Sequence, residues 1–247
     1  NRESDPTLTD NQKQLHKRLN WRKYDFGISF DGDSDRIAFL DEKGRNINSA
    51  VIGALVAKRL LLKEPKAKVA YTGLTSRSYE EAILAAGGKP VLTRVGHAFV
   101  KETMRKKEAV FGCEHSGHFF FRDYFYTDSV VLTLLEVLDA YVETRKEGKT
   151  FGEMVEPYLV YKQTEDIVVK VEDKKLVMDK TEKYLRSLKL SKLRKFDGFI
   201  VDFGDVWGMV KPSVTEFAVK IMFESTDKKL ALKTQKDIVK FVKSVAK

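Results

Sequence analysis

Three aspartates alternate with other residues in the stretch 31–36 (DGDSDR), and an arginine follows the last of them. Apolar runs on both sides predict a loop between two strands. In near-extended chain, residues two apart project to the same side, and three carboxylates that close repel one another unless a cation lies between them. Mg2+ prefers oxygen ligands. The sequence therefore predicts a magnesium site made by Asp31, Asp33 and Asp35, with Arg36 as a fixed positive charge suited to holding a phosphate.

A solvated turn, a calcium loop and a phosphatase nucleophile are the alternatives to a magnesium site in this acidic stretch. A solvated turn accounts for many Asp-x-Asp pairs, but the third aspartate, the adjoining Arg36 and the apolar flanks disfavour it. A calcium EF-hand needs glycine at loop position six, where this chain has Arg36, and helical rather than extended flanks. A phosphatase of the haloacid-dehalogenase type has a strand that runs into Asp-x-Asp, with the first aspartate as nucleophile. That last alternative stays open on these residues alone.

A second candidate is the stretch 94–97 (RVGH), where a predicted strand leads into a predicted helix. Backbone N–H groups at a helix N-terminus favour anions, and His97 can exchange protons near pH 7. A structural role accounts for His97 equally well when this stretch is taken alone.

The third candidate is the loop 112–118 (GCEHSGH), which is more polar than a turn between two strands requires. Glu114 and Ser116 are spaced to accept and donate hydrogen bonds with neighbouring sugar hydroxyls. A zinc site of Glu114, His115 and His118 is the alternative. We disfavour zinc, because such sites need a closed set of ligands and the rest of the chain adds only His16 and His97.

The fourth candidate is the stretch 211–216 (KPSVTE), between two predicted strands near the C-terminus. Its cation, two hydroxyls and loop amides suit a phosphate, which makes Lys211, Ser213 and Thr215 candidate ligands. A polar hairpin accounts for the stretch equally well.

The hydrophobic pattern divides the chain into two regions around a connector at 148–158. In the first region, a short helix at 9–21, capped by Thr9 or Asp10, precedes the acidic loop and its strands. The expected elements after it are helices at 49–63 (capped by Ser49), 77–86, 97–107 and 128–147, and strands at 68–72, 90–94, 109–113 and 118–121. This alternation predicts an α/β layer with a mainly parallel sheet, whose carboxyl ends carry the ligand-binding loops.

The second region has consecutive strands and two helices. The expected strands are 159–171, 199–203, 207–211 and 217–225, and the expected helices are 173–188 and a last helix with Ile238, Phe241, Val242 and Val245 on one face. This pattern predicts an α+β domain with a four-stranded antiparallel sheet.

Composition excludes several classes of protein. The 247 residues are 43% hydrophobic and 33% charged, as in a globular chain. The single cysteine, Cys113, allows no internal disulfide and fits a reducing cytoplasm. The net charge of +9 raises the possibility that the protein binds nucleic acid. The lysines are scattered along helices, however, so we expect small anionic substrates instead. We expect no membrane segment and no signal peptide, and the start without Met is typical of the middle of a longer protein.

Together and in this order, the four stretches resemble the α-D-phosphohexomutase family, and most closely its phosphomannomutase/phosphoglucomutase branch. The stretch 31–36 is similar to the magnesium loop of that family, 112–118 to its sugar-recognition loop, and 211–216 to its C-terminal phosphate loop. The resemblance implies the end of the second family domain at 1–47, the third domain at 48–150, and the fourth at 158–247.

The resemblance also implies a reaction. Members move a phosphoryl group between O1 and O6 of a hexose, through a hexose 1,6-bisphosphate, from a phosphoserine in their first domain. The chain contains no comparable serine loop, so we expect the phosphoserine in a missing N-terminal domain of the same protein. A non-catalytic sugar-phosphate-binding module is the alternative. The implied roles are Mg2+ binding by Asp31, Asp33 and Asp35, charge stabilisation and proton transfer by Arg36, His97 and Arg94, and substrate binding by Glu114, Ser116, His118, Lys211, Ser213 and Thr215.

Four positions depart from the family pattern. Arg94 stands where many relatives have lysine and stays charged, so it can act only electrostatically. Lys211 replaces an arginine and loses the bidentate fork. Val214 replaces a glycine or asparagine that can take positive φ more easily, and Phe217 replaces a proline.

Overall fold

The computed structural model describes residues 5–21, 23–214 and 216–246. These residues form two compact units, 1–160 and 161–247, and each is described here by itself.

The first unit begins with a short helical segment and a three-stranded antiparallel sheet. A 3-10 turn, η1 (Thr9–Gln12), leads into helix α1 (Lys13–Trp21), so the predicted caps Thr9 and Asp10 are wrong, because both residues lie inside the turn. The sheet comprises β1 (Phe26–Phe30), β2 (Ile37–Asp41) and β3 (Asn46–Ile47). In the β1–β2 hairpin Phe30 pairs with Ile37, which leaves residues 31–36 as the connecting loop.

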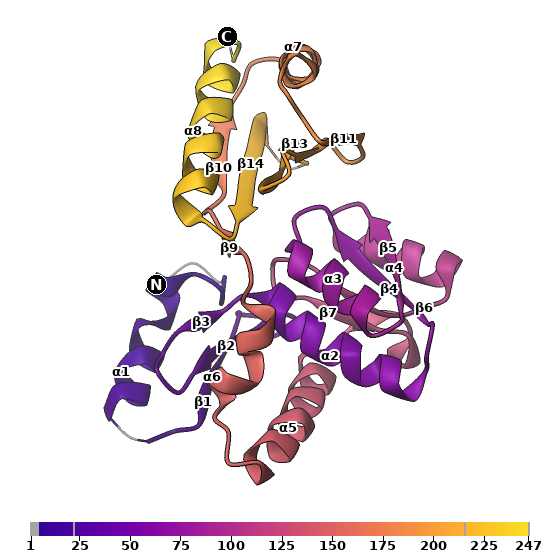
Figure 1. The fold of residues 1–247 in the computed structure, drawn as a ribbon, viewed down its shortest axis with the longest axis vertical. Coiled ribbons are helices and arrows are strands. Elements are labelled where there is room, and N and C mark those ends of the chain that lie inside the picture. The colour runs from indigo at the N-terminus through magenta and orange to yellow at the C-terminus, as the bar shows by residue number, and fades with distance from the viewer. Residues whose placement is uncertain (1–4, 22, 215, 247) are drawn as a thin grey trace. The chain divides into compact units, whose positions relative to one another are not determined.

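A five-stranded mixed sheet forms the centre of the first unit, with strand order β5-β4-β6-β7-β8. Its strands β4 to β7 are labelled in Figure 1. Its strands are β4 (Lys68–Thr72), β5 (Lys89–Thr93), β6 (Ala109–Cys113), β7 (Phe119–Phe121) and β8 (Thr127–Asp128). The first three are parallel neighbours, and β7 and β8 continue the sheet antiparallel. The loops after β4, β5 and β6 therefore leave the same edge of the sheet, as predicted.

Helices pack on both faces of this sheet. Its helices are α2 (Ser49–Lys63), α3 (Arg77–Ala85), α4 (His97–Lys107) and α5 (Val130–Lys146). Val100 and Met104 of α4 form one buried cluster with Ala70 and Phe120. Helix α2 packs in the larger core; a Cβ on its Gly53 would lie 2.8 Å from the Cys113 sulfur, so the glycine permits close packing on β6.

Two predicted features of these helices are wrong. Helix α2 is capped by Asn48, whose side chain accepts a hydrogen bond from the Ala50 amide, rather than by Ser49. The helical spacing of its large apolar residues predicts a buried face of α5 made by Val131, Leu134, Leu135, Leu138, Tyr141 and Val142. Of these, Val131, Leu135 and Val142 are more than half exposed. That helix instead buries Thr133, Val137, Ala140 and Tyr141.

A short helix, α6 (Phe151–Val155), begins at a Thr150–Glu153 capping box in the predicted connector, and the turn η3 (Glu156–Tyr158) follows it.

The second unit is an antiparallel sheet with two helices. Its strands are β9 (Lys162–Gln163), β10 (Ile167–Lys170), β11 (Lys192–Lys195), β12 (Phe199–Asp202), β13 (Val206–Pro212) and β14 (Ala218–Ser225). The order is β10-β14-β13-β12-β11, with β9 also on β14. The predicted count of four strands is wrong, because 159–171 is split into β9 and β10 and β11 is additional. Helices α7 (Lys174–Ser187) and α8 (Lys228–Ser244) each pack one apolar face into the core of this unit, with Val177 and Leu185 of α7 and Ile238 and Val242 of α8 buried.

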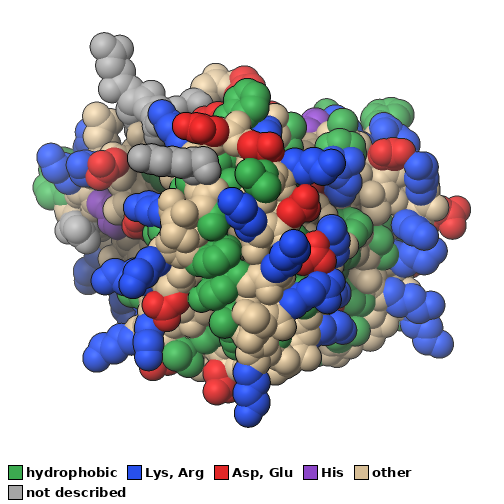
Figure 2. Space-filling view, turned by 90° about the horizontal axis from the view of Figure 1, so that it is seen from above, with side chains coloured by type: hydrophobic (Ala, Val, Ile, Leu, Met, Phe, Trp, Pro, Cys, Tyr) green, Lys and Arg blue, Asp and Glu red, His purple; other side chains and the backbone are tan. Residues whose placement is uncertain are grey.

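The charged side chains are mixed on the face drawn in Figure 2, where Lys and Arg are scattered with Asp and Glu between them. Within the described ranges, no helix is both long and apolar enough to traverse a bilayer.

Candidate active site

The acidic loop brings its three aspartates together as the spacing predicts. One carboxylate oxygen from each of Asp31, Asp33 and Asp35 lies within 4.8 Å of the others, close enough for one divalent ion. Asp33 is exposed and Asp31 buried. Ser34, at φ 60°, makes the left-handed turn of the loop. A Cβ on Gly32 would meet nothing within 4 Å, so packing does not require that glycine.

Arg36 binds the buried carboxylate of this loop. Its Nε donates to the Oδ2 of Asp31 at 2.5 Å and its backbone amide to the Oδ1 at 3.2 Å. Burial alone would raise the pKa of Asp31, but these bonds from Arg36 outweigh it and lower the pKa. Burial raises the pKa of Asp35, and repulsion from the other two aspartates adds to it against the attraction of His118. The loop thus holds unequal carboxylates, with more negative charge than Arg36 neutralises.

The loop after β6 docks onto the acidic loop. The amide of Ile37 donates to the carbonyl of Gly117 at 3.2 Å, and the Nε2 of His118 lies 3.4 Å from the Oδ1 of Asp35. Gly117 has φ +95°, and a Cβ there would lie 3.0 Å from the Ile37 carbonyl oxygen. The glycine is therefore required both by its backbone conformation and by the close approach of β2.

The polar side chains of that loop point into one network. The hydroxyl of Ser116 lies 2.8 Å from the Nδ1 of His118, and a Glu114 carboxylate oxygen lies 3.6 Å from the same nitrogen. The other Glu114 oxygen accepts a hydrogen bond from the Gly96 amide at 2.8 Å, which ties the loop to the start of α4. His115 has a buried Nδ1 without a hydrogen-bond partner and belongs to neither group of three close metal ligands in the described chain.

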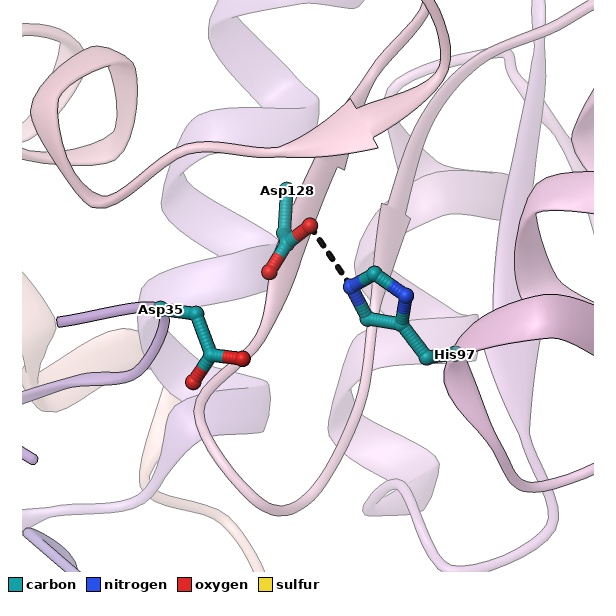
Figure 3. A group of neighbouring side chains, drawn as sticks. All are labelled: Asp35, His97 and Asp128. Atoms are coloured by element: carbon teal, nitrogen blue, oxygen red, sulfur yellow. Dashed lines mark hydrogen bonds and ion pairs between the residues drawn. The ribbon is translucent and has the colours of Figure 1, made fainter. Parts of the chain in front are cut away.

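His97 is the first residue of α4 and belongs to the same site. Its Nε2 lies 2.6 Å from the Oδ1 of Asp128 on β8. The ring centroid lies 5.5 Å from that of His118. Asp35, His97 and Asp128 also place one ligand atom each within 4.8 Å of one another, although they come from three different elements (Figure 3).

Asp128 was not predicted from the sequence. We expected the helix to begin there, whereas the helix starts at Val130 with Ser129 as its cap, and Asp128 pairs with Phe120 in the sheet. An acidic residue just before a capping serine was the only local signal. Arg94, by contrast, is exposed and its guanidinium lies 3.9 Å above the ring of Phe99.

The predicted phosphate loop lies in the second unit. The ammonium of Lys211 is 3% exposed and lies 2.9 Å from the Oδ2 of Asp197, so its charge is already paired. The buried hydroxyl of Ser213 has no hydrogen-bond partner in the described chain. Lys174, at the start of α7, donates to the carbonyls of Ser213 and Glu216 at 3.1 and 3.2 Å. Thr215 lies outside the described residues.

The comparisons with known proteins agree with this fold. Residues 48–161 match the family described as "Phosphoglucomutase/phosphomannomutase, alpha/beta/alpha domain III". The chain is 30% identical over 233 residues to a phosphomannomutase of Methanocaldococcus jannaschii, covering 94% of this chain and 50% of that protein. It is 35% identical over 202 residues to a phosphomannomutase of Escherichia coli, covering 81% of this chain and 43% of that protein. The chain belongs to the phosphohexomutase family.

Solved structures share the fold. A phosphoglucomutase/phosphomannomutase family protein of Burkholderia thailandensis superposes with a TM-score of 0.86 at 24% identity, covering 99% of this chain and 52% of that one. The N-acetylphosphoglucosamine mutase of Aspergillus fumigatus, in complex with GlcNAc-6P and magnesium, gives 0.65 at 17% identity, covering 98% and 53%. The chain spans about half the length of the curated relatives it matches.

Proposed function

We propose that the chain forms the metal- and sugar-binding part of a phosphohexomutase, which interconverts hexose 1-phosphate and hexose 6-phosphate. The observation that carries the proposal is the contact between two loops far apart in sequence. The acidic loop and the Glu114–His118 loop meet where His118 lies 3.4 Å from Asp35. A divalent ion on the aspartates would therefore sit beside side chains able to bind sugar hydroxyls, which is what transfer of a phosphoryl group to a sugar oxygen requires.

The reaction consists of two phosphoryl transfers. A phosphoserine gives its phosphoryl group to the free O1 or O6 of the hexose phosphate, which makes the bisphosphate and a serine hydroxyl. After the bisphosphate turns over in the site, the other phosphoryl group returns to the serine and the isomeric monophosphate leaves. The phosphoserine is expected outside these 247 residues, in a domain of the same protein, so the chain alone binds sugar phosphate without turnover.

The residues present fit a magnesium ion, because three carboxylates with excess negative charge converge in one loop. Bound Mg2+ would offset charge on the transferring phosphoryl group. Asp31, Asp33 and Asp35 would hold the ion, and the magnesium complex of the A. fumigatus relative supports this choice of metal. Arg36, already bonded to Asp31, keeps that carboxylate ionised and adds positive charge.

The other roles follow from position. Glu114 and Ser116 bind sugar hydroxyls, His97 exchanges a proton with the reacting hydroxyl, and His118 links the sugar loop to the acidic loop. Arg94, exposed at the end of β5, contributes charge alone.

In the second unit, Ser213 and Thr215 bind the phosphate that does not react. The unpartnered Ser213 hydroxyl supports its role, whereas the ion pair with Asp197 makes Lys211 a weaker ligand than its sequence position suggested. We assign residues 1–47, 48–150 and 158–247 to the end of the second, the third and the fourth family domains. We propose a cytoplasmic setting for the protein, with which the free and buried thiol of Cys113 is consistent.

The test is a coupled mutase assay of the full-length polypeptide on mannose 1-phosphate and glucose 1-phosphate, primed with hexose 1,6-bisphosphate. We expect the 6-phosphate from at least one substrate with Mg2+, and a loss of roughly 100-fold or more in Asp33→Ala. Full activity of Asp33→Ala in Mg2+ would contradict the metal assignment. The isolated 247-residue chain should show no turnover.

A further inference from the structure

We propose that Asp128 is the positioning residue of His97: its carboxylate accepts a hydrogen bond from the imidazole Nε2–H and leaves Nδ1 as the nitrogen that exchanges a proton. The proposal rests on the proposed mutase function for its kinetic consequence, while the orientation of the ring stands on geometry alone. Asp128 is not among the residues that the motifs of the sequence single out.

The distance and the exposure of the two side chains are those expected when a carboxylate fixes the orientation of an imidazole. The His97 Nε2 and the Asp128 Oδ1 are 2.6 Å apart, within the range of a strong, charge-assisted hydrogen bond. The two side chains differ in exposure, 8% for the carboxylate and 39% for the imidazole. The buried partner is thus fixed in the fold, whereas the ring keeps an open side for substrate. Figure 3 shows the Asp128 carboxylate directed at the ring nitrogen.

Neighbouring groups fix both partners. The hydroxyl of Thr127 donates to the same carboxylate oxygen at 3.0 Å, and the Nζ of Lys101 lies 3.9 Å from it. The centroid of Phe120 lies 5.0 Å from that of the His97 ring, which limits its rotation. Burial acts to raise the pKa of Asp128, but the Thr127 hydrogen bond and His97 outweigh it and lower the pKa. Asp128 therefore stays ionised, and an ionised carboxylate at one ring nitrogen fixes the tautomer and the orientation of the ring.

A divalent ion held by Asp35, His97 and Asp128 is the rival assignment for the same cluster. A metal bound through Nε2 needs that nitrogen unprotonated, with the proton on Nδ1. The positioning role requires the opposite tautomer. The protonation site of the neutral His97 ring therefore separates metal binding from positioning.

The first test is 15N NMR of the 247-residue chain with 15N-labelled histidine, at a pH where the imidazoles are neutral. The chain has four histidines, and His97 is assigned by its loss in His97→Gln. We expect Nε2 protonated in the wild type and a shift toward Nδ1 protonation in Asp128→Asn, because the amide can donate to Nε2. Asp139→Asn, an exposed aspartate of α5, is the control and should leave the spectrum unchanged. Nδ1 protonation in the wild type, or an unchanged tautomer in Asp128→Asn, overturns the proposal.

The second test measures kinetics in the full-length polypeptide. General acid–base groups contribute roughly 100-fold to 10,000-fold, and we expect Asp128→Asn to lower kcat by about 10-fold to 100-fold, since the ring remains but is misoriented. KM should change by less than about 2-fold, and Asp128→Glu should retain more kcat than Asp128→Asn. An unchanged kcat, or an equal loss in both variants, overturns the functional part. A wild type without mutase activity would refute the proposed function, while the NMR result would still decide the role of Asp128.

Discussion

The Nε2 of His118 lies 3.4 Å from the Oδ1 of Asp35, although the two residues come from loops on different sheets of the first unit. The backbone supports this contact, because the Gly117 carbonyl accepts the Ile37 amide at 3.2 Å. The acidic loop and the sugar-side loop are therefore held together by both side chains and backbone. Measurements of unfolding and of metal binding should therefore each report on one side of this contact between the two loops.

We expect Gly117→Ala to destabilise the chain more than Gly87→Ala does. Both glycines have positive φ, +95° and +78°, which costs an alanine about 1–2 kcal/mol. Only at position 117 would the new Cβ also meet backbone, at 3.0 Å from the Ile37 carbonyl oxygen, whereas position 87 is open. Urea unfolding should give an additional loss of about 1 kcal/mol or more for Gly117→Ala. Equal losses for the two variants would argue against the close approach of the loops.

Mg2+ should raise the thermal stability of the chain through the acidic loop. A ligand present at about 100 times its Kd adds about 2.7 kcal/mol to the free energy of unfolding. Asp33→Asn should remove most of this gain without lowering the stability measured in EDTA, because Asp33 is exposed. Differential scanning calorimetry with Mg2+ and with EDTA measures both quantities. An Mg2+ effect of the same size in Asp33→Asn would place the ion elsewhere.

Glu136 should stabilise the first unit in a pH-dependent way. Its carboxylate accepts hydrogen bonds from Lys63 at 2.9 Å and Arg59 at 3.1 Å, joining α5 to α2. Burial would raise the pKa of Glu136, but these two partners outweigh it and lower the pKa below its usual value near 4.5. A lowered pKa means that the stabilisation is present above the unfolded pKa and is lost as pH falls through the folded pKa.

Glu136→Gln should therefore cost about 1 kcal/mol at pH 7 and nearly nothing at about pH 3. Glu143→Gln is the matched control, because Glu143 pairs with the same Arg59 but is 68% exposed. It should cost less at pH 7. Urea unfolding at both pH values provides the comparison, and a loss from Glu136→Gln that persists unchanged in acid would contradict the sign of the pKa shift.

Lys211 should stabilise the fold of the second unit through its buried charge. Removing its ammonium breaks the 2.9 Å ion pair with the Asp197 carboxylate, which is only 9% exposed. We expect Lys211→Met to destabilise the second unit by about 3 kcal/mol, and the double variant Lys211→Met/Asp197→Asn to recover most of that loss. Lys174→Met, which removes a less buried ammonium that donates from α7 to two carbonyls of the same loop, should cost less. A double variant no more stable than Lys211→Met would show that the ion pair is not the cause.

The loops that carry the candidate site residues could be predicted from the sequence, because each is marked by a short run of neighbouring residues. The spacing of Asp31, Asp33 and Asp35 predicts that their carboxylates lie close together, and the parallel arrangement of β4, β5 and β6 brings His97 and Glu114 to one edge. Asp128 could not be predicted, because its place depends on the pairing of β8 with β7 and on two left-handed residues before it, Phe125 and Tyr126.

Other errors have the same origin in tertiary structure. Strand β11 (Lys192–Lys195) has three basic residues in four positions, so no apolar alternation marks it, and it forms only by pairing with β12. The buried face of α5 is predicted wrongly because Val131, Leu135 and Val142 recur at helical spacing along one side of the helix. The residues that are buried recur at the same spacing along another side. Periodicity identifies the helix but does not decide which of two partly apolar stripes faces the core.

The most direct test of the proposed mutase function follows the phosphate group of the substrate by 31P NMR. 31P NMR of the full-length polypeptide with mannose 1-phosphate and a trace of hexose 1,6-bisphosphate should show the 1-phosphate resonance replaced by that of the 6-phosphate in Mg2+. The conversion should stop in EDTA and in Asp33→Asn. Accumulation of inorganic phosphate that Asp31→Asn abolishes, without 6-phosphate, would instead identify a phosphatase with Asp31 as nucleophile and would contradict the account.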